Sequence, residues 1–142
     1  MRYIIPVWKL ARVATLRVFK TKWFRRFARR GRIVDAELCE AIARANRGLI
    51  DADLGGNVIK QRVAQPGQGR SGGYRNLIVF RAGDSAVFVF GFAKSSQGDL
   101  EPDELDDVRT AAKLLLGYGP QQLDAAVANQ ELWEVMCDDE AL

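Results

Sequence analysis

Residues 74–94 decide the fold, and they read YRNLIVFRAGDSAVFVFGFAK. Two runs rich in Val, Ile and Phe, over 74–81 and 86–94, flank Ala82-Gly83-Asp84-Ser85, which is typical of a tight hairpin turn. The second run is apolar at nearly every position, as expected for a central strand that is covered on both faces. This stretch therefore predicts a β-hairpin at the centre of the domain.

Further strands are predicted on either side of this hairpin. Residues 58–64 predict a strand, and residues 65–73 read QPGQGRSGG, which predicts a flexible turn with few side chains to obstruct a ligand. Residues 49–57 predict a loop. A short strand is expected near the start, over 16–20, and a last edge strand over 132–136.

Helices are expected both before and after the strands. Thr21 is suited to cap a helix over 22–30, and Asp35 to cap a second helix over 36–47. Because only a few residues join these two helices, an antiparallel helical hairpin is predicted. Two more helices are expected over residues 99–116 and 121–128. The order of elements predicts an α+β fold with a small antiparallel β-sheet, an N-terminal helical hairpin and C-terminal helices.

The composition is that of one soluble globular domain with a real core. The chain has 142 residues, of which 48% are hydrophobic and 27% charged. No apolar run approaches the roughly 20 residues of a membrane span, and we expect a cytoplasmic protein. The two cysteines, Cys39 and Cys137, lie far apart, and the chain contains no histidine. A metal site is therefore not expected. Cys39 is predicted to pack in a helix, and Cys137 to be a reduced thiol.

Charge is distributed unevenly along the chain although the net charge is only +3. Residues 1–33 carry 11 Lys or Arg and no acid, whereas residues 99–142 carry 12 acids and 2 basic side chains. An isolated basic segment indicates a polyanionic partner, and the acidic end is expected to screen the basic segment or to repel other anions.

Cations recur along the predicted strands and their connections. Because side chains on a strand alternate between two faces, Lys60 and Arg62 are expected to share a face. Arg is suited to phosphate, since its planar fork matches two phosphate oxygens and stays charged. Without histidine, ordinary imidazole acid–base catalysis is excluded. The sequence thus predicts a phosphate-handling surface, and RNA is the substrate that it favours.

Two groups of motifs resemble a known family. Ser71-Gly72-Gly73-Tyr74-Arg75 after a Lys-x-Arg strand, and an apolar strand ending Gly91-Phe92-Ala93-Lys94, resemble the RelE/HigB superfamily of bacterial toxins. The segments 17–24 and 54–62 resemble one RelE-like subfamily closely. The similarity covers about residues 16–136, and it rests on the order and spacing of the motifs. It implies a single RelE-like domain over 16–142, with residues 1–15 as an extension that is either loosely attached or not native.

The resemblance implies a type II toxin that cleaves mRNA, typically in the ribosomal A site, and that a cognate antitoxin neutralises, often one of the helix-turn-helix type. It implies no cofactor, because the 2′-hydroxyl of the substrate is the nucleophile and the product is a 2′,3′-cyclic phosphate. By position, Arg75 is implied to stabilise the transition state, and Lys60, Arg62 and Lys94 match the other cations of the family's site. Further RNA contacts are expected at Arg70, Arg81 and Tyr74.

The chain departs from the best-known family pattern at one place. Ser95 and Ser96 stand after Lys94, where a tyrosine is usual, so the group that moves the proton is left open. Two alternatives keep the fold and change the function, since fold alone does not fix function. One is a ParE-like toxin that poisons DNA gyrase without cleaving RNA, and the other is an inactive homologue that serves as a co-repressor with its antitoxin.

Overall fold

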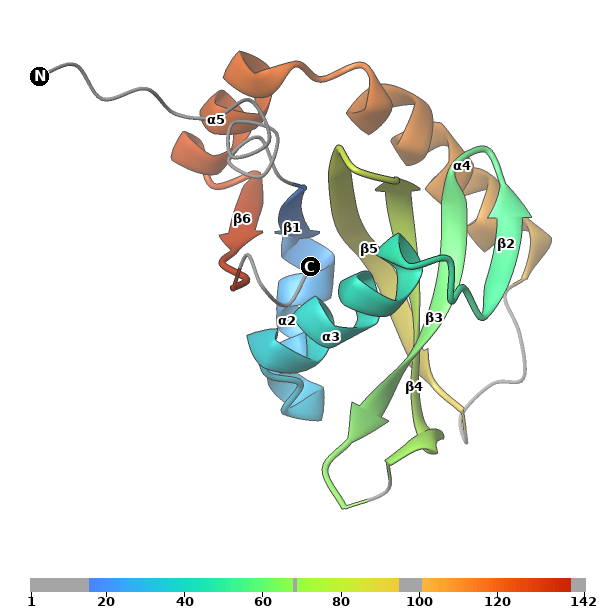
Figure 1. Cartoon of the computed structure of the whole chain (residues 1–142). Helices are drawn as coiled ribbons and strands as arrows, with labels where there is room; N and C mark the ends of the chain where they lie inside the picture. The colour runs from blue at the N-terminus through green and yellow to red at the C-terminus, as the bar shows by residue number, and fades with distance from the viewer. Residues whose placement is uncertain (1–15, 68, 95–100, 139–142) are drawn as a thin grey trace, which may run out of the picture.

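The structure is a computed structural model, and it describes residues 16–67, 69–94 and 101–138, without the side chains of residues 70 and 71. The extension predicted over residues 1–15 lies outside the described residues. Six strands and four helices follow one another along the described chain (Figure 1), and their bounds are β1 Arg17–Thr21, α2 Lys22–Gly31, α3 Asp35–Asn46, β2 Ala52–Gly55, β3 Val58–Gln65, β4 Gly69–Arg81, β5 Ser85–Ala93, α4 Pro102–Leu116, α5 Pro120–Ala128 and β6 Leu132–Val135.

The strands form a six-stranded mixed sheet in the order β2-β3-β4-β5-β1-β6. The α+β class is confirmed, but the prediction of a purely antiparallel sheet is wrong. β1 pairs with β5 in parallel, with Phe19 opposite Val87, whereas the other pairs in this sheet are antiparallel. The reason is that β1 and β5 meet only after a long crossover through α2, α3 and three strands, and no local signal encodes the direction of such a pair.

Two strand boundaries differ from the prediction. The glycine-rich stretch is mostly strand, because β4 already begins at Gly69 and extends to Arg81. Gly73 permits this close pairing, since a Cβ at that position would collide with the carbonyl oxygen of Val63 on β3. The predicted loop before β3 contains the short strand β2, which pairs with β3 through Ala52 opposite Lys60. Both segments are rich in residues that disfavour strands, so pairing across the sheet overrides their local propensity.

Helices cover both faces of the sheet, and each face has its own apolar core. On one face, Phe24 and Phe27 of α2 and Leu38 of α3 pack with sheet residues such as Ile78 and Phe88. On the other face, the helices α4 and α5 pack on a second cluster, made of Phe19, Val58, Leu77, Val79, Val87, Val108, Ala112, Leu123, Ala126 and Leu132. In Figure 1, α2 and α3 lie in front of the sheet and α4 lies behind it. Alternate side chains of each inner strand therefore enter different cores.

The helical hairpin forms largely as predicted. Thr21 caps α2, because its Oγ1 accepts a hydrogen bond from the backbone N–H of Phe24 at 3.2 Å. Asp35 does not cap α3, contrary to the prediction. Val34 is the N-cap residue, and Asp35 is the first helical residue, whose carboxylate accepts a hydrogen bond from Lys20 Nζ at 2.9 Å. No helix among the described residues is both long enough and apolar enough to cross a membrane.

Cys39 packs in a helix as predicted, but the prediction that Cys137 is a reduced thiol is wrong. Cys39 in α3 and Cys137 beyond β6 form a disulfide that spans 98 positions of the sequence. The disulfide fastens the end of the described chain to the face that α2 and α3 cover. The spacing in the sequence could not show this pair, because only the packing of β6 beside α3 brings the two positions together.

Candidate functional site

Three of the predicted cations lie on neighbouring strands in two cross-strand rows. In the first row Arg62 of β3 is opposite Arg75 of β4, and Arg75 is opposite Phe92 of β5. In the second row Lys60 is opposite Leu77, and Leu77 is opposite Phe90. Residues directly opposite each other point to the same side of a sheet. The two rows thus place Lys60, Arg62 and Arg75 on one face.

This face is the one that α4 covers in part. Leu77 and Val79 pack with Val108 and Ala112 of α4, and Arg75 shares their side of β4 because side chains alternate. The cover changes along the strand: Leu77 is fully buried, Lys60 and Arg75 are half-buried, and the side chain of Arg62 is 47% exposed. The cations therefore stand where the helical cover ends, on a surface that a solute can reach.

Asp51, just before β2, holds Arg62 in place. Its carboxylate accepts hydrogen bonds from the backbone N–H of Arg62 at 2.7 Å and from the Arg62 guanidinium at 3.0 Å. The buried Arg44 of α3 lies 3.4 Å from the same carboxylate and donates to the carbonyl oxygen of Arg62. Glu40 in turn accepts a hydrogen bond from Arg44 at 2.9 Å. This chain of contacts fixes the edge of β3 from which Arg62 projects.

The charges of these groups shift one another's pKa values. Burial raises the pKa of Asp51, but the hydrogen bonds from Arg62 and the charges of Arg62 and Arg44 outweigh it, so that this pKa lies below its ordinary value. Partial burial, and then the like charge of Arg62, lower the pKa of Arg75, while Asp51 opposes that shift. Two guanidinium groups thus repel each other across the β3–β4 pair. An anion bound between them would relieve this repulsion.

Lys94 lies at the border of this group, two positions beyond Phe92, whereas Arg81 and Tyr74 do not join it. Lys94 is exposed just beyond β5, where its backbone N–H donates to Gly73 at 3.3 Å. Arg81 lies at the opposite end of β4, where it contacts Asp84 at 3.3 Å and the carbonyl oxygen of Leu116. Tyr74 points to the other face and is buried, with its hydroxyl 3.4 Å from the carbonyl oxygen of Gly31. The side chain of Arg70 lies outside the described residues.

Sequence reasoning missed Asp51 and Arg44. Both residues stand in segments without a motif, and Asp51 was expected in a loop. Only the pairing of β2 with β3 and the approach of α3 bring them to Arg62. The alternation of β3 was the signal that located Lys60 and Arg62, but it could not show what holds them.

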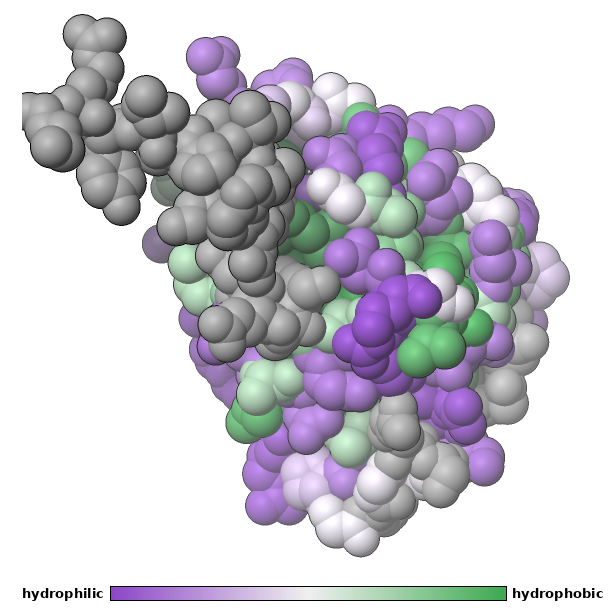
Figure 2. Space-filling view, viewed as in Figure 1, coloured by the Kyte–Doolittle hydropathy of each residue, from purple (hydrophilic) through white to green (hydrophobic). Residues whose placement is uncertain are grey.

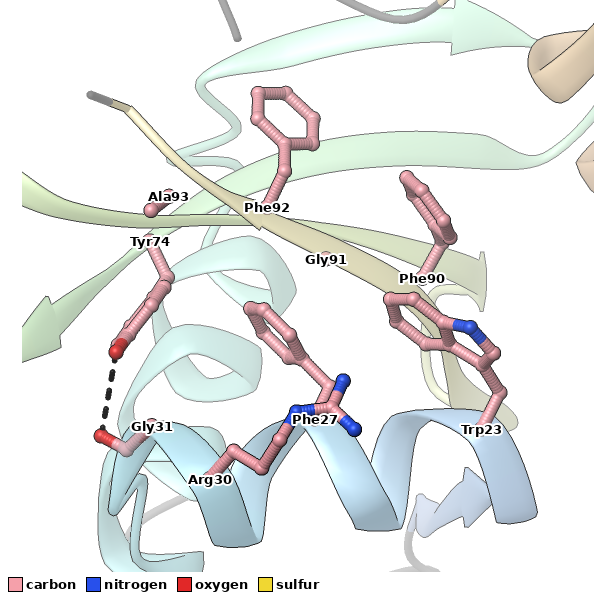
Figure 3. Close-up of a pocket in the computed structure, with 9 residues that line it drawn as sticks. All are labelled: Trp23, Phe27, Arg30, Gly31, Tyr74, Phe90, Gly91, Phe92 and Ala93. Carbon is pink, nitrogen blue, oxygen red and sulfur yellow. Dashed lines mark hydrogen bonds between the residues drawn. The ribbon is translucent and has the colours of Figure 1, made fainter. Parts of the chain in front are cut away.

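Two hollows flank a pair of stacked rings at the edge of this region. Trp23 of α2 stacks on Phe90 of β5 with 4.5 Å between ring centroids. On one side of the stack is a pocket of about 390 Å³ between α2 and β5, and Figure 3 shows the nine residues that line it. On the other side is a groove of about 470 Å³ that reaches Glu104 and Asp107 of α4. The two hollows share aromatic walls but differ in charge.

The fold and the cations agree with one class of protein, a small α+β toxin. The chain matches, over residues 16–135, the family model described as RelE toxin of the RelE/RelB toxin-antitoxin system. The protein therefore belongs to the RelE toxin family, as the sequence motifs predicted, and a RelB antitoxin is the cognate partner of such a toxin. No curated protein and no solved structure matches the chain.

Proposed function

We propose that this RelE-family toxin is a metal-independent mRNA endonuclease whose site is formed by Lys60, Arg62 and Arg75, with Lys94 at its border. The observation that carries the proposal is the row of Arg62 opposite Arg75, with Lys60 two positions before Arg62 on the same face. Clustered cations that α4 leaves within reach of a solute are able to bind a phosphate group and to stabilise its negative charge. A toxin that acts only by binding a protein has no need of them.

The reaction is the attack of a ribose 2′-oxygen on the adjacent phosphorus. The bond from phosphorus to the 2′-oxygen forms and the bond to the 5′-oxygen breaks, which leaves a 2′,3′-cyclic phosphate and a 5′-hydroxyl. The guanidinium groups of Arg75 and Arg62 bind the non-bridging oxygens, where negative charge accumulates. The proton of the 2′-hydroxyl passes to solvent water, and the ammonium group of Lys60 delivers a proton to the departing 5′-oxygen and is reprotonated from water.

Asp51 serves this site as a positioning residue. Its hydrogen bonds with the backbone and the side chain of Arg62 orient that guanidinium, and a carboxylate with a lowered pKa is a weak proton acceptor. The role of Asp51 is to hold Arg62 in position and to moderate the repulsion between Arg62 and Arg75.

Inducible expression of the wild type, Arg75→Ala and Arg81→Ala tests the proposal, with primer extension on a reporter mRNA as the measurement. We expect cuts with the wild type and with Arg81→Ala, and none with Arg75→Ala. Arg81 is the matched control, because it occupies the same face of β4 at the opposite end. Growth arrest with intact mRNA and damaged DNA would contradict the proposal and indicate a gyrase poison.

Ribosome dependence belongs to the same proposal. Incubating the purified toxin with the reporter mRNA, with and without translating ribosomes, measures it, and we expect cuts only with ribosomes. Adding the cognate antitoxin, which we expect to be a helix-turn-helix protein, is expected to abolish the cuts. Cleavage of free mRNA at the same positions would show that the ribosome is not required.

A further inference from the structure

The pocket between α2 and β5 has an aromatic wall built from both elements. Trp23 stacks on Phe90 at 4.5 Å and on Phe27 at 5.5 Å, and Phe27 meets Tyr74 edge to face at 5.1 Å. Gly91 forms the floor, because any larger side chain there would collide with the ring of Phe27. Figure 3 shows Trp23 and Phe27 rising from α2 toward the strand, with Tyr74 closing the far end.

The pocket opens where the sheet leaves an edge uncovered. β1 pairs with β5 only as far as Phe88, so that on the side away from β4 residues 89–93 of β5 have α2 rather than a strand beside them. Trp23 is 42% exposed, in contrast with the fully buried Phe24 next to it. Seen from the side of α3, the described surface shows apolar patches among mostly hydrophilic residues (Figure 2). Trp23 is one of several large hydrophobic side chains that are exposed, and it differs from Val34 and Leu49 in that it lines this pocket.

The helix that carries Trp23 has an excess of unpaired positive charge. Residues 16–34 contain eight Lys or Arg and no acid. Arg17 pairs with Glu134, Lys20 pairs with Asp35, and Arg25 stacks on Trp133. Within the part of the chain that the structure describes, the remaining five are exposed and form no ion pair; they are Lys22, Arg26, Arg29, Arg30 and Arg32.

Two of these cations lie on the same side of α2 as Trp23. Arg30 lines it, and Arg26 lies three positions after Trp23 and four before Arg30, so all three share one side of α2. The groove on the other side of the Trp23–Phe90 stack is lined by Glu104 and Asp107, which repel a phosphate chain. Of the two hollows, charge therefore assigns a polyanion to the pocket beside Arg26 and Arg30.

We propose that this pocket binds an unpaired RNA base, stacked on Trp23, while Arg26 and Arg30 bind the phosphates beside that base. Aromatic rings with flanking cations are the elements from which proteins build binding sites for single-stranded nucleic acid. The inference rests on the proposed function, since it concerns the same RNA that is cut at Arg75. It adds a second contact region and a place where one base is held.

The pocket adjoins the cationic site closely enough to hold the same strand. Tyr74 precedes Arg75 directly, and Phe92, another residue of the pocket lining, is the cross-strand neighbour of Arg75. One strand spacing of about 4.8 Å separates Arg75 from Phe92, and the rings of Phe92 and Phe90 are 6.4 Å apart. Tyr74 and Gly91 face α2 whereas Arg75 points to the other face, so one RNA strand reaches both regions by passing round the edge of β5 that β1 leaves uncovered.

The experiment measures the binding of a short single-stranded RNA that carries 2-aminopurine at one position at a time. All proteins carry Arg75→Ala so that the RNA stays intact. We expect the fluorescence to be quenched at one position, which has a fixed offset from the cleavage site mapped with the wild type. Adding Trp23→Ala is expected to abolish the quenching and to weaken binding roughly tenfold. Arg26→Ala and Arg30→Ala are each expected to reduce the slope of the logarithm of affinity against the logarithm of salt concentration by about 1, since each removes one phosphate contact.

Two control variants and one conservative variant make the result specific. Asp107→Asn alters the acidic groove, and Arg47→Ala removes an exposed cation at the far end of α3, so both should bind RNA as before. Trp23→Phe retains an aromatic ring and should retain much of the affinity, which keeps the test valid if Trp23→Ala unfolds.

Three results would overturn the inference. First, Trp23→Ala and the Arg26 and Arg30 variants could bind RNA with unchanged affinity and quenching. This result would exclude the pocket as the base-binding site and would leave the proposed function standing. Loss of antitoxin binding in Trp23→Ala, with RNA binding unchanged, would assign the pocket to the protein partner. If the wild type neither cuts nor binds RNA, the proposed function fails together with the inference.

Discussion

The two faces of the sheet are covered by helices to different extents. On the face of α2 and α3, the inward side chains of β4, such as Asn76, Ile78 and Phe80, are all buried, and the Cys39–Cys137 disulfide fastens the end of the described chain there. On the face of α4 and α5, cover begins at the β4–β5 hairpin and stops beyond Leu77, which leaves Arg75 half-buried. The first face is therefore closed over β4, whereas on the other face the cover stops short of Arg75, where the proposed site lies.

A comparison along β4 supports the same conclusion. Arg75 and Arg81 lie on the same face, six positions or about 20 Å apart. Arg81 contacts Asp84 and the last turn of α4, where a structural role accounts for it. Arg75 lies across from Arg62, so that two like charges face each other. The position relative to α4, rather than the residue type, distinguishes the two arginines. Predictions that separate stability from activity test this comparison.

The largest effect is expected from removing the disulfide. A cross-link that spans 98 positions restricts the unfolded chain strongly, so Cys137→Ser should lower the free energy of unfolding by about 4–5 kcal/mol. Denaturant unfolding of the wild type with and without reductant measures it, and Cys137→Ser is expected to resemble the reduced wild type. Equal stability of the oxidised and reduced proteins would show that the closed face does not depend on the cross-link.

The second effect concerns activity and leaves stability nearly unchanged. Arg75→Ala removes a cation from the site and should lower the cleavage rate by about 10²- to 10³-fold, because charge on the phosphate is no longer stabilised. Arg81→Ala should change the rate little. Single-turnover cleavage and thermal unfolding of both variants measure this difference. Similar losses of activity in both variants would contradict the distinction between the two ends of β4.

A smaller effect is expected at Asp51. Asp51→Asn keeps one acceptor for the Arg62 backbone but removes the charge that orients the guanidinium, so a roughly tenfold slower cleavage is expected. In the Asp51→Asn background, Arg62→Lys or Arg62→Ala should then slow cleavage little further, because Asp51 and Arg62 act as a unit. Additive losses in this double-mutant cycle would show that Asp51 acts independently of Arg62.

The smallest effect is a dependence of stability on pH. Because the pKa of Asp51 is lower in the folded protein than in the unfolded chain, its contribution is fully present above the unfolded value, near 4, and is lost as the pH falls through the folded value. Asp51→Asn lacks this contribution at neutral pH. The difference in unfolding free energy between the two proteins should therefore shrink on acidification, and a constant difference from pH 7 to pH 3 would contradict the assignment.

Much of the framework could be predicted from local patterns. The helices α2, α4 and α5 and the hairpin of β4 and β5 follow from caps, apolar periodicity and turn residues, which act over a few positions. The alternation of β3 placed Lys60 and Arg62 on one face for the same reason. β2 and the first residues of β4 could not be predicted, because Asp and Gly there disfavour strands and only pairing with β3 imposes the conformation.

By itself, the sequence determined that the domain is α+β, that its cations recur along the strands and that it resembles the RelE toxins. Short-range physics and the identity of the motifs suffice for these conclusions. The tertiary structure alone decided the parallel pair of β1 and β5, the Cys39–Cys137 disulfide and the contact of Asp51 with Arg62. It also decided that Arg75 lies across from Arg62, whereas Arg81 contacts the last turn of α4. Each of these depends on contacts between residues far apart in the chain, whose energies arise only once the sheet is assembled.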